Sequence, residues 1–310
     1  MEQKGLLQVF LKGCAMGAAD VVPGVSGGTV AFVTGVYDKL LSSLLALRPR
    51  LFKVYMHRGF KGVWSEIDGS FLFSLVAGIA LSILSLSRGI LFLLKEYPHP
   101  LWAFFFGLVL ASSFVVSKKV TRWKLEKLIF LCLGLIVGYF LTAISPVEMT
   151  PNFLNVFLSG FIAICAMILP GISGSFILLI LGMYTPIIEA LTHFNFKILL
   201  LFATGCLCGL FSFARLLKWL FEYYNQITLS FLIGLMLGSL NKVWPWKETL
   251  QTFINRHGEQ VPLIQKNVLP STFLQKTGED PLTVIAIIVF FCGLFFVVGI
   301  EKSNQDARKN

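Results

Sequence analysis

The chain has 310 residues, of which 56% are hydrophobic and only 14% are charged, and its formal net charge is +10. Soluble domains carry about a quarter of their residues as charged side chains. The composition therefore excludes an ordinary soluble protein, a secreted disulfide scaffold and a disordered chain. Most basic residues lie between apolar runs, which indicates the positive-inside bias of membrane proteins and not a nucleic-acid surface. We expect a multi-pass, all-α integral membrane protein that binds no nucleic acid.

The first apolar segment, residues 5–47, is broken in its middle. Lys12 interrupts the apolar run and Asp20 follows it, so the segment does not resemble a signal peptide and is expected to remain part of the fold. Pro23 removes a helical hydrogen-bond donor, and Gly24 is a poor helix former. We predict two half-helices that form a re-entrant hairpin, which enters the bilayer and returns on the same side.

Six further runs are apolar enough to span a membrane, which takes about 20 residues. Backbone groups in hydrocarbon must bond internally, so these runs are predicted to be helices. A second interrupted segment, 153–192, breaks at Pro170 and Gly171 and is predicted to form a second re-entrant hairpin. The predicted spans are residues 70–94, 101–117, 128–147, 198–222, 226–241 and 281–300.

The chain repeats itself. The two interrupted segments align without gaps at an offset of 147 residues, and both contain Pro-Gly-x-Ser-Gly followed at the same distance by Gly-x-Tyr. A later stretch repeats at an offset of 127 residues and matches Arg88 with Arg215. We predict two copies of one unit, residues 1–147 and 148–310, within one integrated transmembrane domain. Each copy has an odd number of full spans, so the copies must be inverted in the membrane, as in many transporters.

The charges predict an orientation. The basic segments 48–68 and 118–127 are expected in the cytoplasm together with both termini, in a cell (inner, cytoplasmic) membrane. The loop 242–280 is an exception, because it carries five basic residues and would lie outside. Its role is not assigned by the sequence. Trp244 and Trp246, at the start of this loop, are typical of an interfacial aromatic belt.

Each interruption is a candidate anion site. Ser26 or Ser173 can cap the half-helix that follows, whose free N–H groups and positive dipole end attract anions. We expect the two tips to face each other and to hold a phosphate. The alternative is that Pro-Gly only kinks a packed helix and that the glycines let helices touch. The helix-break residues are Pro23, Gly24, Pro170 and Gly171, and the candidate phosphate ligands are Ser26, Gly27, Gly28, Thr29, Ser173, Gly174 and Ser175.

Two arginines lie inside apolar helices at matching repeat positions. A central Arg costs about 2.5–3.5 kcal/mol on the insertion scale, so Arg88 and Arg215 need a partner or a water-filled cavity. We predict that both bind phosphate through charge-assisted hydrogen bonds. The alternative is that they extend to the ends of their helices and reach the membrane surface.

Asp20 lies at the first tip, whereas its counterpart at the second tip is Met167. Asymmetry in an otherwise repeated site favours a role for Asp20 in coupling to protons or another cation. The alternative is an interfacial carboxylate that pairs with Lys12 or Lys39.

The Gly-x-Ser-Gly pattern around Ser26 and Ser173 also occurs in intramembrane serine proteases. Such an enzyme needs a histidine base within a span. The histidines lie instead in linkers or near segment ends, at His57, His99, His193 and His257. The six cysteines lie in apolar stretches without a CxxC pair, so we expect neither a metal site nor a cofactor. The sequence therefore favours a transporter over a hydrolase.

The stretch from Gly17 to Thr29, followed by Gly35-Val36-Tyr37, resembles the signature of a bacterial and archaeal membrane family described as polyprenyl-phosphate transporters, PopT-like. The resemblance extends through Pro170-Gly171-Ile172-Ser173-Gly174 and covers nearly the whole chain. It implies a flippase that moves undecaprenyl phosphate, or a related polyprenyl phosphate, between leaflets by alternating access. Such transport recycles a carrier lipid for cell-wall synthesis.

The expected partners are this lipid and the bilayer, with proton or cation coupling. A small-anion or inorganic phosphate carrier or channel that uses the same tips is the alternative.

Overall fold

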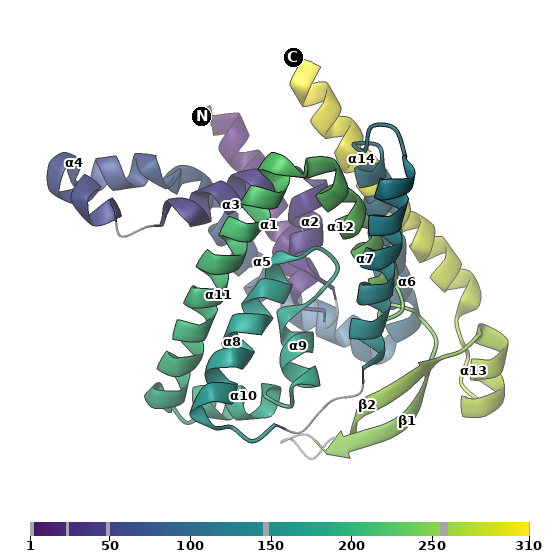
Figure 1. Ribbon diagram of the computed structural model, residues 1–310. Coiled ribbons are helices and arrows are strands. Elements are labelled where there is room, and N and C mark those ends of the chain that lie inside the picture. Colours follow the sequence, from purple (N-terminus) through teal and green to yellow (C-terminus); the bar gives the residue numbers. More distant parts are fainter. Residues whose placement is uncertain (1–2, 23–24, 48–49, 145–148, 255–259, 310) are drawn as a thin grey trace.

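The computed structural model describes residues 3–22, 25–47, 50–144, 149–254 and 260–309. These residues are mostly helical, and the start of α1 (Gln3–Asp20) lies on the same side of the molecule as the end of α14 (Thr283–Lys309) (Figure 1). By length and composition, five described helices can cross a membrane, and two bent helix pairs pass the same test together. The protein is therefore a multi-pass helical membrane protein, as expected.

The first interruption separates α1 from α2 (Gly27–Val33); Pro23 and Gly24 lie outside the described residues. A second turn follows at Gly35, whose φ of 74° is a left-handed conformation that glycine adopts without strain. Helix α3 (Tyr37–Ala46) begins two residues later and is bent by 112° from α2. The Gly-x-Tyr pattern therefore marks a second bend after the first interruption.

The second interruption has the same construction. Helices α8 (Phe153–Ile168) and α9 (Gly174–Ile180) lie on either side of Gly171, whose φ is 93°. Helix α10 (Tyr184–Thr192) is bent by 110° from α9, and Gly182 between them has a φ of 65°. Helices α8 and α9 pack against each other, and α10 crosses their lower ends (Figure 1). The second Pro-Gly pair thus interrupts the helix as predicted.

The remaining predicted spans overlap helices, although residues 145–147 of the predicted span 128–147 lie outside the described residues. Helix α12 has only 15 residues, which is short for a full span, whereas α14 continues well beyond residue 300. The other helix bounds are α5 (Gly69–Glu96), α6 (Pro98–Ser117), α7 (Leu125–Ala143), α11 (Phe196–Tyr223) and α12 (Asn225–Ser239).

The segment between α12 and α14 corrects the all-α expectation. Strands β1 (Lys247–Ile254) and β2 (Gln260–Asn267) form an antiparallel hairpin, and α13 (Pro270–Thr277) follows. Short, largely polar strands contain no long apolar run, so the hairpin lacks the signal that marks the spans. The basic linker forms helix α4 (Arg50–Glu66), which has no buried residue and projects from the bundle (Figure 1).

The two halves show matching helix pairs, two of which lie within a half and two of which join one half to the other. Helix α1 packs along α5 as α8 packs along α11, and α6 packs against α14 as α12 packs against α7. Matching glycines bring backbones together. A Cβ on Gly78 would lie 2.1 Å from Phe10 O, and a Cβ on Gly205 would lie 2.1 Å from Phe157 O. No side chain fits at either position, so these glycines set the distance between the helices.

Replacing Gly78 or Gly205 by Ala is expected to destabilise the protein, because the new methyl group must push two backbones apart. Overpacking of this kind costs about 1–3 kcal/mol. The measurement is thermal unfolding of the purified protein in detergent. The control is Gly89→Ala on the same helix as Gly78, since nothing lies within 4 Å of a Cβ there. An unchanged unfolding midpoint in Gly78→Ala would contradict the close packing.

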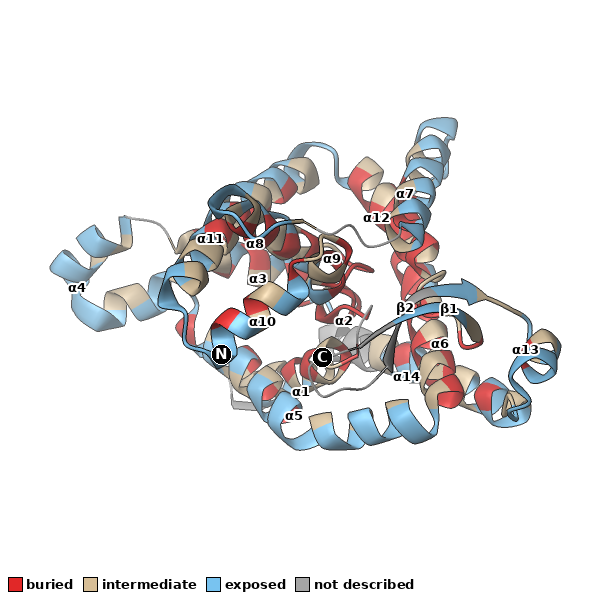
Figure 2. Ribbon diagram, turned by 90° about the horizontal axis from the view of Figure 1, so that it is seen from below, coloured by how far each residue is buried: buried red, intermediate tan, exposed pale blue. Residues whose placement is uncertain are grey.

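The buried core lies where the two halves meet. Helices α2, α6 and α12 contribute most of their residues to it, and Figure 2 shows these helices coloured largely as buried. The outer faces of α5 and α11 instead expose large apolar side chains such as Leu84 and Leu200. An apolar periphery around a buried centre is the surface that lipid chains cover.

Candidate functional site

Two hydrogen bonds join the two interruptions. Gly171 N donates to Thr29 Oγ1 over 2.8 Å, and both residues are buried. Tyr37 Oη donates to Ile168 O over 3.1 Å. The two tips therefore lie together, as the sequence led us to expect, and the threonine of the first tip contacts the Pro-Gly pair of the second.

The first tip is enclosed, and side chains already occupy its helix start. Ser26 Oγ accepts a hydrogen bond from Gly28 N over 3.1 Å, and Asp20 Oδ1 accepts one from Gly27 N over 2.7 Å. Ser26, Gly27 and Thr29 are buried, and Asp20 is half-buried. The positive end of a helix favours a carboxylate, so Asp20 occupies a position suited to an anionic ligand. The sequence located the serine cap but not the contact of Asp20.

The second tip is more open and has different side chains. Ser173 Oγ lies 2.8 Å from Ser175 Oγ and makes no side-chain cap of α9. Ser173 is buried, Gly174 is half-buried and Ser175 is exposed. Met167, also exposed, stands at the position of the first tip's carboxylate. The two tips therefore have similar sequences but differ in their accessibility to a ligand.

The two arginines lie on exposed positions of α5 and α11 and take no part in the hydrogen bonds that join the tips. Arg88 and Arg215 are exposed on α5 and α11, each eight residues before the last residue of its helix, Glu96 or Tyr223. At 1.5 Å per residue, each lies about 12 Å from the end of its helix. Within the described part of the chain, neither guanidinium forms an ion pair.

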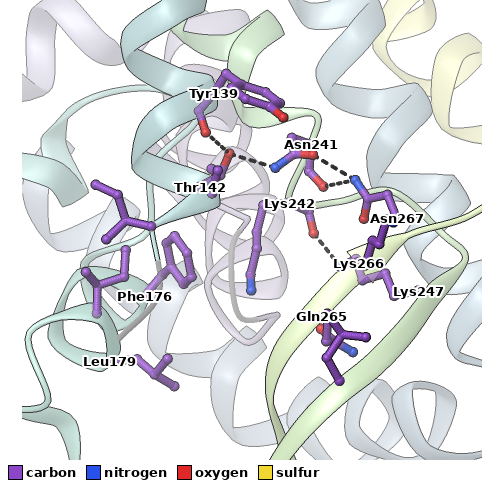
Figure 3. Close-up of a pocket in the computed structure, with 14 residues that line it drawn as sticks. Tyr139, Thr142, Phe176, Leu179, Asn241, Lys242, Lys247, Gln265, Lys266 and Asn267 are labelled. Atoms are coloured by element: carbon purple, nitrogen blue, oxygen red, sulfur yellow. Dashed lines mark hydrogen bonds between the residues drawn. The ribbon is translucent and has the colours of Figure 1, made fainter. Parts of the chain in front are cut away.

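A cavity of about 440 Å³ lies between α9, the end of α7 and the β1–β2 hairpin (Figure 3). Lys242, Lys247 and Lys266 line it, and no Asp or Glu among the described residues does. The only sequence signal for this cavity was the basic composition of the loop 242–280, which conflicted with the predicted orientation. The cavity brings three of those charges to one place.

The lysines contact aromatic rings and each other. Lys242 Nζ lies 4.5 Å from the centre of the Phe176 ring on α9, and Lys247 Nζ lies 4.3 Å from that of Trp102. Lys247 Nζ also donates to Lys242 O over 2.5 Å. Burial, together with the charge of Lys242, lowers the pKa of Lys247 to about 7, and burial also lowers the pKa of Lys242. The cavity therefore holds closely spaced cations that lack a compensating carboxylate among the described residues.

A serine hydrolase would need a histidine beside its nucleophile. In the described part of the chain, Ser26 and Ser173 form hydrogen bonds with Gly28 and Ser175, and neither forms one with a histidine. The described histidines lie on α4, in the first turn of α6 and after α10: His57, His99 and His193. His257 lies outside the described residues.

Several apolar helices, together with two interrupted helices that meet in the buried core, define the class of helical membrane proteins, in which interrupted helices are frequent among transporters. The chain belongs to the undecaprenyl phosphate translocase-like family (VCA0040-like), whose model matches residues 16–261. The family resemblance noted in the sequence is thereby confirmed.

Two relatives share most of their length with the chain. It is 49% identical over 296 residues to a polyprenyl-phosphate transporter of Vibrio cholerae serotype O1, and the match covers 96% of each protein. It is 30% identical over 254 residues to a polyprenyl-phosphate transporter of Staphylococcus aureus, and this match covers 76% of the chain and 85% of the relative. No solved structure matches.

Proposed function

We propose that the protein is a flippase that moves undecaprenyl phosphate, or a related polyprenyl phosphate, between the leaflets of the cytoplasmic membrane. The observation that carries the proposal is the buried junction of Thr29 with Gly171, because it brings the two interrupted helices to one point. The relatives supply the substrate class, since both are polyprenyl-phosphate transporters. The transport needs no covalent chemistry, and it would return a carrier lipid for cell-wall synthesis.

Residues 1–147 and 148–310 are proposed to be inverted repeats, with both termini in the cytoplasm. The matching helix pairs support this, because a twofold axis in the membrane plane would relate α1 and α5 to α8 and α11. The matched contacts of Gly78 and Gly205 support the same axis. Rocking of one repeat against the other would open the site to each side in turn.

The phosphate is proposed to bind at the two tips. The second tip is open, and its ligands would be Ser173, Gly174 and Ser175. The ligands at the first tip would be Ser26, Gly27, Gly28 and Thr29. There the Asp20 carboxylate already accepts the hydrogen bond of Gly27 N, so a phosphate must displace it. Protonation of Asp20, or its pairing with a cation, would release that N–H and couple transport to the ion.

Arg88 and Arg215 are proposed to bind the phosphate at lateral entrances, one for each leaflet. In an inverted arrangement the two side chains lie near opposite membrane surfaces. Their exposure on the outer faces of α5 and α11 lets a guanidinium reach a headgroup while the isoprenoid chain stays in lipid.

The lysine-lined cavity favours one alternative, a carrier or channel for inorganic phosphate. Lys242, Lys247 and Lys266 offer charge to any phosphate, with or without a lipid chain. Uptake of labelled inorganic phosphate into liposomes separates this alternative from lipid transport.

In liposomes, the purified protein is expected to move a polyprenyl phosphate between leaflets, and joint Arg88→Ala and Arg215→Ala substitution is expected to slow this at least tenfold. A hydrogen bond to a charged group is worth about 1.5–3 kcal/mol, or roughly a 10- to 150-fold change in rate. The measurement is a leaflet-resolved transport assay.

The control for this experiment is Lys218→Ala, which removes a charge from α11 that pairs with Glu222 at 3.9 Å. Wild-type transport by the double arginine variant refutes the role of the arginines. Phosphate uptake without lipid movement in the wild type refutes the flippase.

A further inference from the structure

We propose that the cavity between α9 and the β1–β2 hairpin is a binding site for a phosphate monoester, which Lys242, Lys247 and Lys266 hold beside the second tip. The part of this inference that assigns the phosphate to a lipid rests on the proposed function. It assigns a role to the loop 242–280, which the tips and the arginines leave without one.

The walls of the cavity are held in place by a chain of hydrogen bonds (Figure 3). Asn267 Nδ2 donates to both Asn241 O and Asn241 Oδ1, over 2.8 Å each. Asn241 Nδ2 in turn donates to Thr142 Oγ1 over 3.3 Å. Asn267 ends β2 and Thr142 lies in the last turn of α7. The hairpin is thereby tied to the helices, so its lysines are positioned before any ligand arrives.

The positive charges of the cavity favour an anionic ligand. The Lys242 side chain extends into the space between Phe176 and the hairpin (Figure 3). Lys247 adds a second ammonium group, whose pKa is lowered by burial and then by the charge of Lys242, and Lys266 adds a third at the exposed edge. A bound phosphate would offset this repulsion and accept charge-assisted hydrogen bonds from the ammonium groups.

The rest of the lining favours a phosphate that carries a hydrocarbon chain. The volume of about 440 Å³ lies in the range of small-molecule pockets. Leu179, Ile144 and Leu250 form an apolar part of the wall, and the last two are exposed. Next to them, the outer face of α7 presents Ile136 and Phe140. An isoprenoid chain could therefore leave the cavity along α7 while its phosphate stays with the lysines.

Binding of farnesyl phosphate, farnesol and inorganic phosphate to the full-length protein in nanodiscs tests the site. The wild type is expected to bind farnesyl phosphate at least tenfold more tightly than farnesol. The double variant Lys242→Gln, Lys247→Gln should lose at least tenfold in affinity for farnesyl phosphate. The control Lys276→Gln should bind as the wild type does, because Lys276 pairs with Glu248 and does not line the cavity.

Unchanged affinity in the double variant overturns the site. If that variant does not fold, Lys266→Glu replaces it, since Lys266 is exposed and its substitution should be tolerated. A carboxylate at this position should weaken binding at least threefold, and an unchanged affinity again overturns the site. If inorganic phosphate binds as tightly as farnesyl phosphate, and the same variants lose that binding, the cavity is an anion site for free phosphate and not for a lipid.

The transport assay separates this inference from the proposed function. A wild type that binds farnesyl phosphate through the lysines but moves no polyprenyl phosphate refutes the flippase and keeps the site. Transport and binding that both remain at wild-type levels in the double lysine variant refute the site and keep the flippase.

Discussion

Thr29→Val is expected to slow polyprenyl-phosphate transport at least tenfold and to lower the thermal stability of the protein, whereas Thr29→Ser should retain most of both. Valine has nearly the shape of threonine but lacks the hydroxyl group that accepts the hydrogen bond of Gly171 N. The buried N–H would then have no partner, at a cost of about 1–3 kcal/mol. Transport in liposomes and thermal unfolding in detergent measure the two effects.

Thr34→Val is the matched control for this change. Thr34 is also buried and lies at the end of the same half-helix, but its hydroxyl group donates to Val30 O within α2. Its loss leaves the contact between the interruptions intact, so transport should change little. A wild-type transport rate in Thr29→Val would show that the junction of the two tips is not needed for transport.

Asp20→Ala is expected to slow gradient-driven transport at least tenfold, because it removes the carboxylate proposed to take up the coupling ion, and Asp20→Asn is expected to remove the response of transport to an ion gradient. The amide oxygen of Asn can still accept the hydrogen bond of Gly27 N, as Asp20 Oδ1 does over 2.7 Å. The amide has no negative charge, so it can neither take up a proton nor attract a cation. The measurement is lipid transport in liposomes with an imposed proton or sodium gradient, and without one.

A gradient response that persists in Asp20→Asn contradicts coupling through Asp20 and leaves this side chain only its role at the start of α2. Met167→Asp provides the reciprocal experiment at the second tip. Met167 is exposed, and a carboxylate there should compete with phosphate for the start of α9. Undiminished transport in Met167→Asp would contradict phosphate binding at that tip.

The interruptions could be predicted from the sequence because their causes are local. Proline lacks the N–H that a helix needs, and glycine tolerates the positive φ seen at Gly171, Gly35 and Gly182. Apolar length alone located most of the spanning helices. These properties depend only on residues that are close together in the chain, so they can be predicted from a single sequence.

The cavity and the contacts of the tips could not be predicted in the same way. Lys242 and Phe176 are separated by more than sixty positions in the chain, and only the folded structure brings them together. Similarly, apolar periodicity does not show whether Arg88 faces the core or the lipid, and the structure places it on an exposed face. The positive charge of the loop 242–280 is evident from the sequence. Its role in lining a cavity depends on the β1–β2 hairpin, which no apolar run in the sequence predicts.

The junction between the interruptions also has a consequence for how readily the molecule can change shape. Its two hydrogen bonds, from Gly171 N to Thr29 Oγ1 and from Tyr37 Oη to Ile168 O, contribute about 0.5–1.5 kcal/mol each. Breaking both costs only a few times the thermal energy. A ligand that binds the conformer without these two bonds about 5- to 150-fold more tightly therefore offsets their loss, so the binding free energy of the substrate itself can separate the tips.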